Sequence, residues 1–176
     1  MPADKARLYV ALYVRGGVAK MPDNEDKYHW ALLVAPKNED DDPTGTRYHA
    51  KNAPGQSTWI FEEKSTSMNA TNMILVRVMI GKINDPQALA TKLRQVPIVN
   101  NDPGWNCVTW LRSALALIAQ DVSLMGTSSL RWEAVKATAL RYCEQKAAQG
   151  RFNGTSKFDT SKVPTFDLLQ GKETTK

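Results

Sequence analysis

Residues 105–115 read WNCVTWLRSAL and mark the point at which the chain changes from loop to helix. The Asp-Pro-Gly at 102–104 is typical of a turn, and Asn106 is a favourable N-cap residue. Apolar residues then recur at helical spacing, at positions 107, 108, 111, 114, 115 and 118. The stretch therefore predicts a largely buried helix that begins at Cys107 and runs to about Gln120.

The thiol of Cys107 falls in the first turn of that helix. The positive end of a helix dipole favours the thiolate, which is the nucleophilic form of cysteine. A free cysteine is, however, also among the most buried residue types and often acts only as a small apolar side chain. Whether Cys107 is a nucleophile therefore depends on a base that the rest of the chain must supply.

Length and composition indicate one compact globular domain, because 176 residues with 42% hydrophobic and 23% charged side chains can bury a core. No apolar run approaches the roughly 20 residues that span a bilayer, and the N-terminus lacks the features of a signal peptide. The two cysteines, Cys107 and Cys143, fit a reducing compartment, and Cys143 is expected to be structural. We therefore expect a cytoplasmic protein with no integral membrane segment.

The net charge of +5 is mild and is spread along the chain. No dense run of Lys and Arg with interleaved aromatic residues occurs, so we expect no nucleic-acid partner. A basic surface is also compatible with peripheral contact with anionic lipid.

Short apolar runs separated by turn residues predict strands in the first half of the chain. The expected strands cover residues 7–14, 28–35, 45–51, 57–62 and 73–80. The short connections between them predict an antiparallel meander. Residues 18–27 are expected to form a loop, and the acid-rich turn at 38–43 a solvated loop, since it lacks the ligand spacing of a calcium loop.

Helices are predicted after these strands. They cover residues 86–96, with Asn84 and Asp85 as capping candidates, then the Cys107 helix, then a segment from Ser128 to Gly150. Residues 151–176 are expected to be a polar tail, anchored by Phe166, Leu168 and Leu169. The order predicts an α+β domain over residues 1–150, with an antiparallel sheet of about five strands packed against helices.

The chain has only two histidines, His29 and His49, and they fall in consecutive predicted strands. A hairpin centred on residue 39 places them opposite each other, with Cβ atoms about 5 Å apart. A slip of one residue would put them on opposite faces. Either histidine alone is most simply a partly buried strand residue. Together with Cys107, however, they supply a nucleophile, a base and a third orienting group.

The segments YHWALLV from Tyr28, YHA from Tyr48, and Asn106-Cys107 at a helix start resemble the lecithin:retinol acyltransferase family. That family comprises circularly permuted relatives of the NlpC-type papain-like hydrolases. The resemblance covers residues 7–120 and implies a permuted papain-like fold. It further implies that Cys107 is the nucleophile, that His29 is the general base, and that His49 orients His29.

The resulting hypothesis is a thiol hydrolase or acyltransferase that acts on an ester, thioester or amide bond through an acyl-Cys107 intermediate. Backbone N–H groups at the helix start would hold the oxyanion. The acyl substrate could be a small molecule, a lipid or a peptide, and no cofactor is expected. Two alternatives stay open. His29, His49 and Cys107 also form a zinc ligand set, and the same fold could serve as a non-catalytic binding module.

Overall fold

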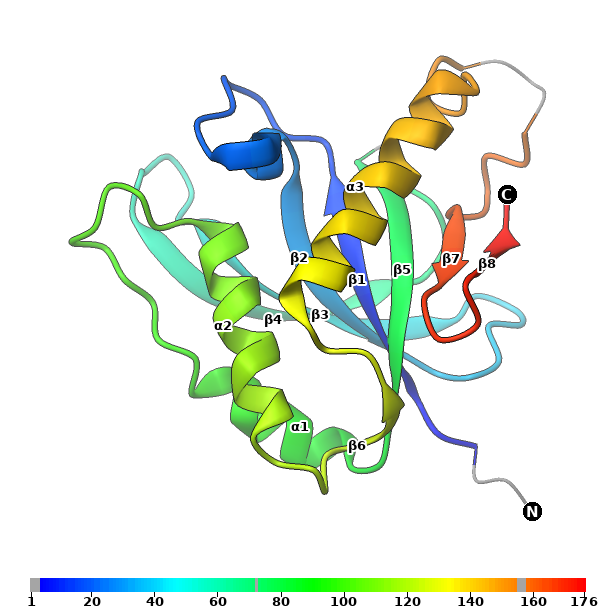
Figure 1. Cartoon of the computed structure of the whole chain (residues 1–176), viewed down its shortest axis with the longest axis horizontal. Helices are drawn as coiled ribbons and strands as arrows, with labels where there is room; N and C mark the ends of the chain where they lie inside the picture. The colour runs from blue at the N-terminus through cyan, green and yellow to red at the C-terminus, as the bar shows by residue number, and fades with distance from the viewer. Residues whose placement is uncertain (1–3, 72, 155–157) are drawn as a thin grey trace.

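The computed structural model describes residues 4–71, 73–154 and 158–176, which form one eight-stranded sheet, three α-helices and a short 3-10 helix (Figure 1). The strands are β1 (Arg7–Tyr13), β2 (His29–Ala35), β3 (Thr44–Asn52), β4 (Trp59–Ser67), β5 (Ile74–Ile83), β6 (Met125–Ser128), β7 (Thr165–Asp167) and β8 (Lys172–Thr175). The helices are η1 (Pro22–Lys27), α1 (Pro86–Arg94), α2 (Cys107–Ala119) and α3 (Trp132–Ala148). The predicted α+β class is confirmed, whereas the sheet is larger than the five strands expected. Within the described part of the chain, no helix is long and apolar enough to cross a bilayer.

The sheet has the order β4-β3-β2-β1-β5-β7-β8, and β6 pairs with β5. Strands β1 to β4 form the predicted antiparallel meander, but β5 pairs with β1 and not with β4. The meander prediction is therefore wrong for the fifth strand. The reason lies in β1, where every residue from Leu8 to Tyr13 is buried. Such a strand needs hydrogen-bonded neighbours on both edges, because its backbone groups have no access to water.

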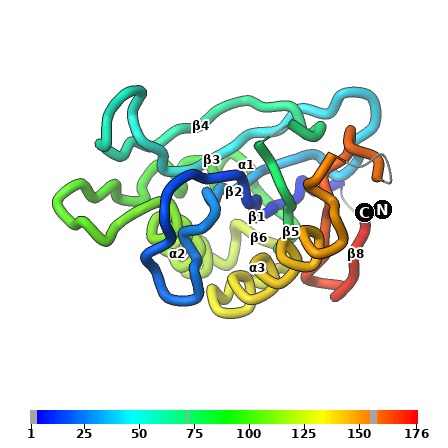
Figure 2. The backbone as a smooth tube through the Cα atoms, turned by 90° about the horizontal axis from the view of Figure 1, so that it is seen from above, coloured from blue at the N-terminus to red at the C-terminus, as the bar shows by residue number. Residues whose placement is uncertain are grey.

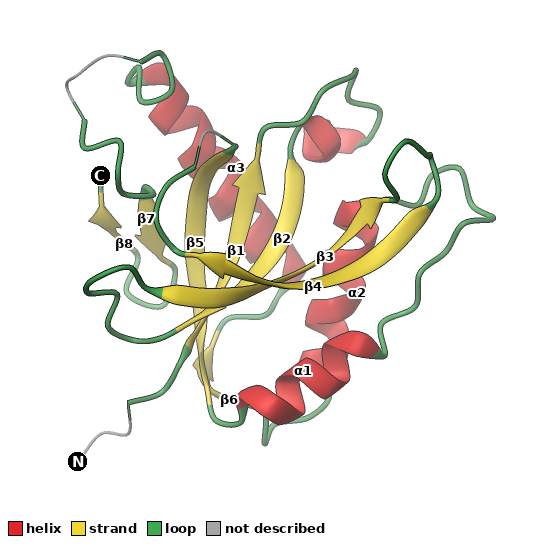
Figure 3. Cartoon of the chain, turned by 180° about the vertical axis from the view of Figure 1, so that it is seen from behind, coloured by secondary structure: helices red, strands yellow, loops and turns green. Residues whose placement is uncertain are grey.

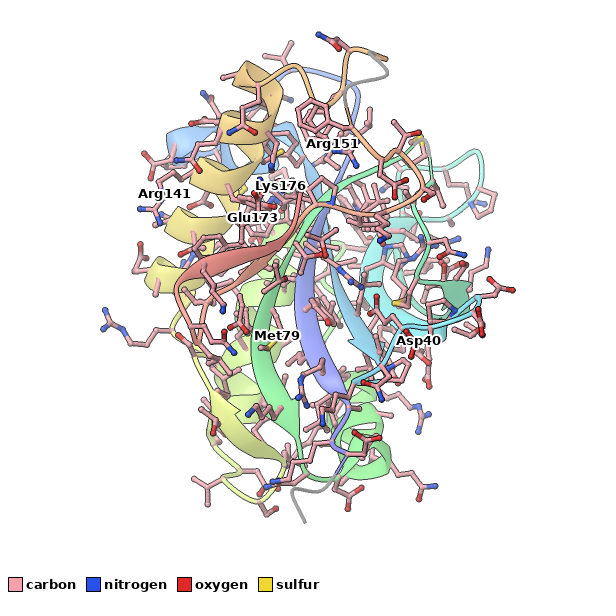
Figure 4. All side chains as sticks on the ribbon, turned by 90° about the vertical axis from the view of Figure 1, so that its right-hand side faces the viewer. Asp40, Met79, Arg141, Arg151, Glu173 and Lys176 are labelled. Carbon is pink, nitrogen blue, oxygen red and sulfur yellow. The ribbon has the colours of Figure 1, made fainter. Side chains whose placement is uncertain are left out.

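The C-terminal segment 151–176, expected to be a polar tail, instead contributes two strands. Strand β7 runs parallel to β5, with Phe166 beside Val78, and β8 pairs with β7. Figure 4 looks onto these strands from the side and labels Glu173 on β8. The hydroxyl of Tyr142 on α3 donates a hydrogen bond of 2.6 Å to Glu173. The polar composition gave no indication of these two strands, because an edge strand leaves many of its side chains in solvent.

The main core lies between the sheet and the helices, and Figure 3 shows α2 and α3 passing behind the strands. Trp30 of β2 and Trp110 of α2 are fully buried in it. A smaller apolar cluster, which includes Tyr13 and Ala31, lies on the opposite face. Since side chains alternate along a strand, the His29 side chain lies on the face of Ala31, opposite to Trp30.

Candidate active site

Helix α2 begins at Cys107, as predicted. The side-chain oxygen of Asn106 accepts hydrogen bonds from the backbone N–H of Val108 (2.9 Å) and Thr109 (3.4 Å). The Thr109 hydroxyl in turn accepts a hydrogen bond of 3.4 Å from the backbone N–H of Asn106, which completes a capping box. The cap therefore fixes Cys107 as the first residue of the helix.

The two histidines contact each other, with His29 Nε2 2.6 Å from His49 Nδ1. Their predicted register is displaced by two residues, because Leu32 pairs with Tyr48, and the same register continued places His49 opposite Ala31. A displacement of two keeps both side chains on one face of the sheet. The imidazoles therefore meet along the diagonal between neighbouring strands rather than directly opposite each other.

A carboxylate completes this row of side chains. Glu62 on β4 lies directly opposite His49, and its Oε1 is 2.9 Å from His49 Nε2. The same carboxylate forms ion pairs with Arg47 and Lys51, which flank His49 on β3. Partial burial works against ionisation of Glu62, but the hydrogen bonds from His49 and Lys51 outweigh it and lower the pKa of Glu62 to about 2.

Glu62 was missed by the sequence analysis, because the position of the turn does not by itself fix the register of the fourth strand. The turn at 52–55 separates the third and fourth predicted strands. A tight hairpin across that turn would place residue 58 opposite residue 49. The structure instead pairs Asn52 with Trp59 across a longer connection, and this register places Glu62 opposite His49.

The directions of these hydrogen bonds follow from the ionised carboxylate. Burial lowers the pKa of His49 to about 4, even though Glu62 opposes the shift. Burial and the neighbouring His49 lower the pKa of His29 to about 3. Both rings are therefore neutral at pH 7, with one donor and one acceptor nitrogen each. His49 Nε2 donates to Glu62, His29 Nε2 donates to His49 Nδ1, and Nδ1 of His29 is left as an acceptor.

Cys107 lies at the same end of the sheet. Its side chain is fully buried, and its thiol contacts the backbone N–H of Trp30, the residue that follows His29. Arg15 Nη1 lies 3.8 Å from Cys107 Sγ. Among the residues that the structure describes, no hydrogen bond joins this sulfur to either imidazole.

Burial raises the pKa of the Cys107 thiol, although the Trp30 amide and Arg15 favour the thiolate. This corrects the expectation that the helix terminus stabilises a thiolate at rest. The free-energy cost of removing a thiolate from water exceeds the electrostatic stabilisation that the helix N-terminus and one guanidinium provide. The resting site therefore holds a neutral thiol and two neutral imidazoles.

Strands β2 and β3 separate at the end of the sheet that carries the histidines. The ladder between β2 and β3 spans only Leu32–Val34 and Thr46–Tyr48, so the two strands part before His29 and His49. Helix α2 contacts both strands. The start of α2 can thereby approach the histidine face from the helix side, at the upper end of the sheet in Figure 1.

The zinc alternative receives no support from the geometry. Within residues 4–71, 73–154 and 158–176, no group of three or more His, Cys, Asp or Glu side chains is arranged to hold a metal ion. His49 uses both of its ring nitrogens in hydrogen bonds. The second cysteine, Cys143, is buried in α3 beside Tyr28, and burial raises the pKa of its thiol to about 11.

Comparison with known proteins gives one match. The model of a family of unknown function, DUF6914, matches residues 5–175 of the chain. No curated protein and no solved structure matches it.

Proposed function

We propose that this chain, which belongs to the DUF6914 family of unknown function, is a cysteine-dependent hydrolase or acyltransferase. It acts on an ester, thioester or amide bond through an acyl-Cys107 intermediate, on a permuted papain-like architecture in the cytoplasm. One observation supports this above all. The row Glu62–His49–His29 leaves an acceptor nitrogen on His29, next in the chain to the residue whose N–H contacts the Cys107 thiol.

Acylation starts from the neutral pair. Cys107 Sγ attacks the carbonyl carbon while its proton passes to Nδ1 of His29, and the carbonyl electron pair moves onto the oxygen. Glu62, through His49, stabilises the imidazolium that forms. The tetrahedral adduct collapses, the bond to the leaving group breaks, and the proton on His29 goes to that group. The product is a thioester on Cys107.

Deacylation reverses these roles. Water or another acceptor attacks the thioester carbonyl, gives its proton to His29, and the thiol leaves with that proton restored. The oxyanion of both steps is held by the N–H of Cys107, since the Asn106 cap takes the next two N–H groups of the helix.

The substrate classes are an ester, a thioester and an amide of a small molecule, lipid or peptide, and the test presents one chromogenic donor of each kind. We expect release from at least one donor with the wild type and with Cys143→Ala. We expect none with Cys107→Ala and at least about 100-fold less with His29→Ala, because general-base catalysis contributes about that much. Equal release by Cys107→Ala would contradict the proposal, and no release from any donor by the wild type would favour the non-catalytic binding module.

A further inference from the structure

The thiol that must react has no exposed surface, and the segment between β1 and β2, residues 14–28, here called the cover segment, lies against the start of its helix. Two of its side chains contact the start of α2. Arg15 Nη1 lies 3.8 Å from Cys107 Sγ, and the Asn106 side-chain amide donates to Met21 Sδ at 3.2 Å. Figure 2 looks onto this end of the molecule, where the dark blue cover segment lies over the start of α2. Cys107 is thus covered on this side by the segment and on the other by the main core.

The cover segment is a small unit with its own internal hydrogen bonds. The Asp26 carboxylate accepts from the backbone N–H of Lys20 and Met21, at 2.9 and 2.9 Å. Arg15 donates to the Asp26 carbonyl at 3.2 Å. Gly16 and Gly17 form its first turn, and a Cβ on either glycine would meet no atom within 4 Å. A unit closed on itself, with open space around a two-glycine turn, can move as one piece.

The two ends of the cover segment are fixed to the body of the protein, by a backbone hydrogen bond of 2.8 Å from Val14 to Met73 and by the buried ring of Tyr28. Between these ends, side chains rather than a backbone ladder hold it. The Trp30 indole donates to the Glu25 carbonyl at 2.7 Å. Lys136 on α3 forms ion pairs with Glu25 (3.0 Å) and Asp23 (3.3 Å), both in η1. Segments held by a few side-chain contacts open at lower free energy than segments in a sheet.

Two of the four described non-glycine residues with positive φ lie in the cover segment, and the other two, Asp41 and Asp42, lie in the acid-rich turn. Asp23 and Asn24, within η1, have φ values of 58° and 54°. Consecutive left-handed residues other than glycine persist only where the surrounding contacts hold them, and such strain clusters at switch regions. Here the contacts that hold this backbone are the ion pairs of Lys136 with Asp23 and Glu25, which lie on either side of Asn24 in the chain.

We propose that the cover segment is a lid over Cys107, which Lys136 holds shut through Glu25 and Asp23, and that it must open before an acyl donor reaches the sulfur. This inference rests on the proposed function for its biological meaning. The physical claim concerns only access to the Cys107 thiol, which is measured without any acyl donor.

The test is the rate of Cys107 alkylation by iodoacetamide at fixed pH, in a Cys143→Ala background. Lys136→Met keeps the aliphatic stem and removes the charge. We expect its alkylation rate to exceed the parent rate by about five- to tenfold, as for the loss of an ion-pair cluster that closes a segment. Lys136→Arg should keep the parent rate. Lys172→Met, which removes an exposed lysine on β8, is the matched control and should also keep it.

Two further measurements separate a lid from a general loss of stability. Added salt should speed alkylation of the parent protein but not of Lys136→Met, since screening weakens only the intact cluster. Amide hydrogen exchange in Lys136→Met should rise within residues 14–28 and stay unchanged in the sheet. An unchanged alkylation rate, or exchange that rises throughout the sheet, would overturn the lid. An open lid with no acyl-enzyme under any condition would instead overturn the proposed function and leave the lid intact.

Discussion

At the scale of single residues, Glu62 determines the direction of the hydrogen bonds that join it to His49 and His49 to His29. Its carboxylate only accepts hydrogen bonds, so the proton on His49 sits on Nε2 and the proton on His29 sits on Nε2 as well. The opposite order would place a proton on Nδ1 of His29, where the proposed mechanism needs a lone pair. We therefore regard Glu62 as a positioning residue that acts through His49.

The substitution Glu62→Gln tests that role. It preserves the shape of the side chain but removes the charge and adds an amide donor. We expect the rate of acylation to fall by about 10- to 100-fold, as for other outer carboxylates that orient a histidine. The pH at which acylation is fastest should also change, which a purely structural role would not cause.

The neighbouring substitution Glu63→Gln is the control. Glu63 points away from the histidines and forms a two-point ion pair with Arg94, at 2.7 and 2.8 Å. It should leave acylation unchanged. If both substitutions slowed acylation equally, the effect of Glu62 would come from the strand and not from the histidine row.

The sequence predicts some properties of these residues and not others. Asn106 is a favourable N-cap residue, so local sequence predicts that Cys107 is the first residue of the helix. The burial of its thiol does not, because Arg15 and Met21 lie 92 and 85 residues from their partners along the chain. Contacts at that separation depend on the whole fold. The burial that the fold produces raises the pKa of the Cys107 thiol, and Arg15 opposes that shift without outweighing it.

At the scale of elements, one arginine ties the acid-rich turn to the sheet. Arg77 of β5 donates to both carboxylate oxygens of Glu39 at 2.7 Å. Its Nε donates to the hydroxyl of Thr165 on β7 at 2.9 Å, and its guanidinium lies 4.3 Å from the centroid of the Tyr9 ring on β1. The turn at 38–43 is therefore not simply a solvated loop, since one of its acids holds two strands and the turn together.

The substitution Glu39→Ala leaves the buried Arg77 charge without its anion. We expect the free energy of unfolding to fall by about 3 kcal/mol, because removing one partner of a buried pair is costly. Asp40→Ala, next in the chain and exposed, should change it by less than about 0.5 kcal/mol. Urea unfolding of the two variants measures the difference. Equal effects would mean that the turn, and not the ion pair, carries the stability.

The strands that the sequence predicts are those with a local apolar pattern, β1 to β5. Two features of the sheet escape such a pattern. The pairing of β5 with β1 joins segments about 65 residues apart and follows from the burial of β1 on both sides. Strand β7 has only three residues, and β8 alternates between exposed and half-buried side chains, so neither carries an apolar run.

At the scale of the whole molecule, folding excludes protons from the site. The folded pKa values of about 3 for His29 and about 4 for His49 lie below the value of 6.5 for an unperturbed histidine. As pH falls from about 6.5, the unfolded chain binds protons that the folded chain does not, so the free energy of unfolding decreases. Glu62 extends the loss from pH 4.5 towards 2, because its folded pKa is also lowered.

Urea unfolding between about pH 7 and pH 5 measures this dependence. Each excluded proton contributes a slope of about 1.4 kcal/mol per pH unit. These are the only histidines of the chain, so the double substitution His29→Gln/His49→Gln should flatten the slope in that range. An unchanged slope would show that the imidazoles are protonated as readily in the folded protein as in the unfolded chain.

The most direct test of the central claim is the mass of the intact protein after a single turnover with an activated thioester. The account predicts one acyl group on Cys107 in the Cys143→Ala protein, and slow or absent acylation when His29→Ala is added. Acylation that proceeds equally well without His29, or a label that survives Cys107→Ala, would contradict the assignment of this pair as nucleophile and base.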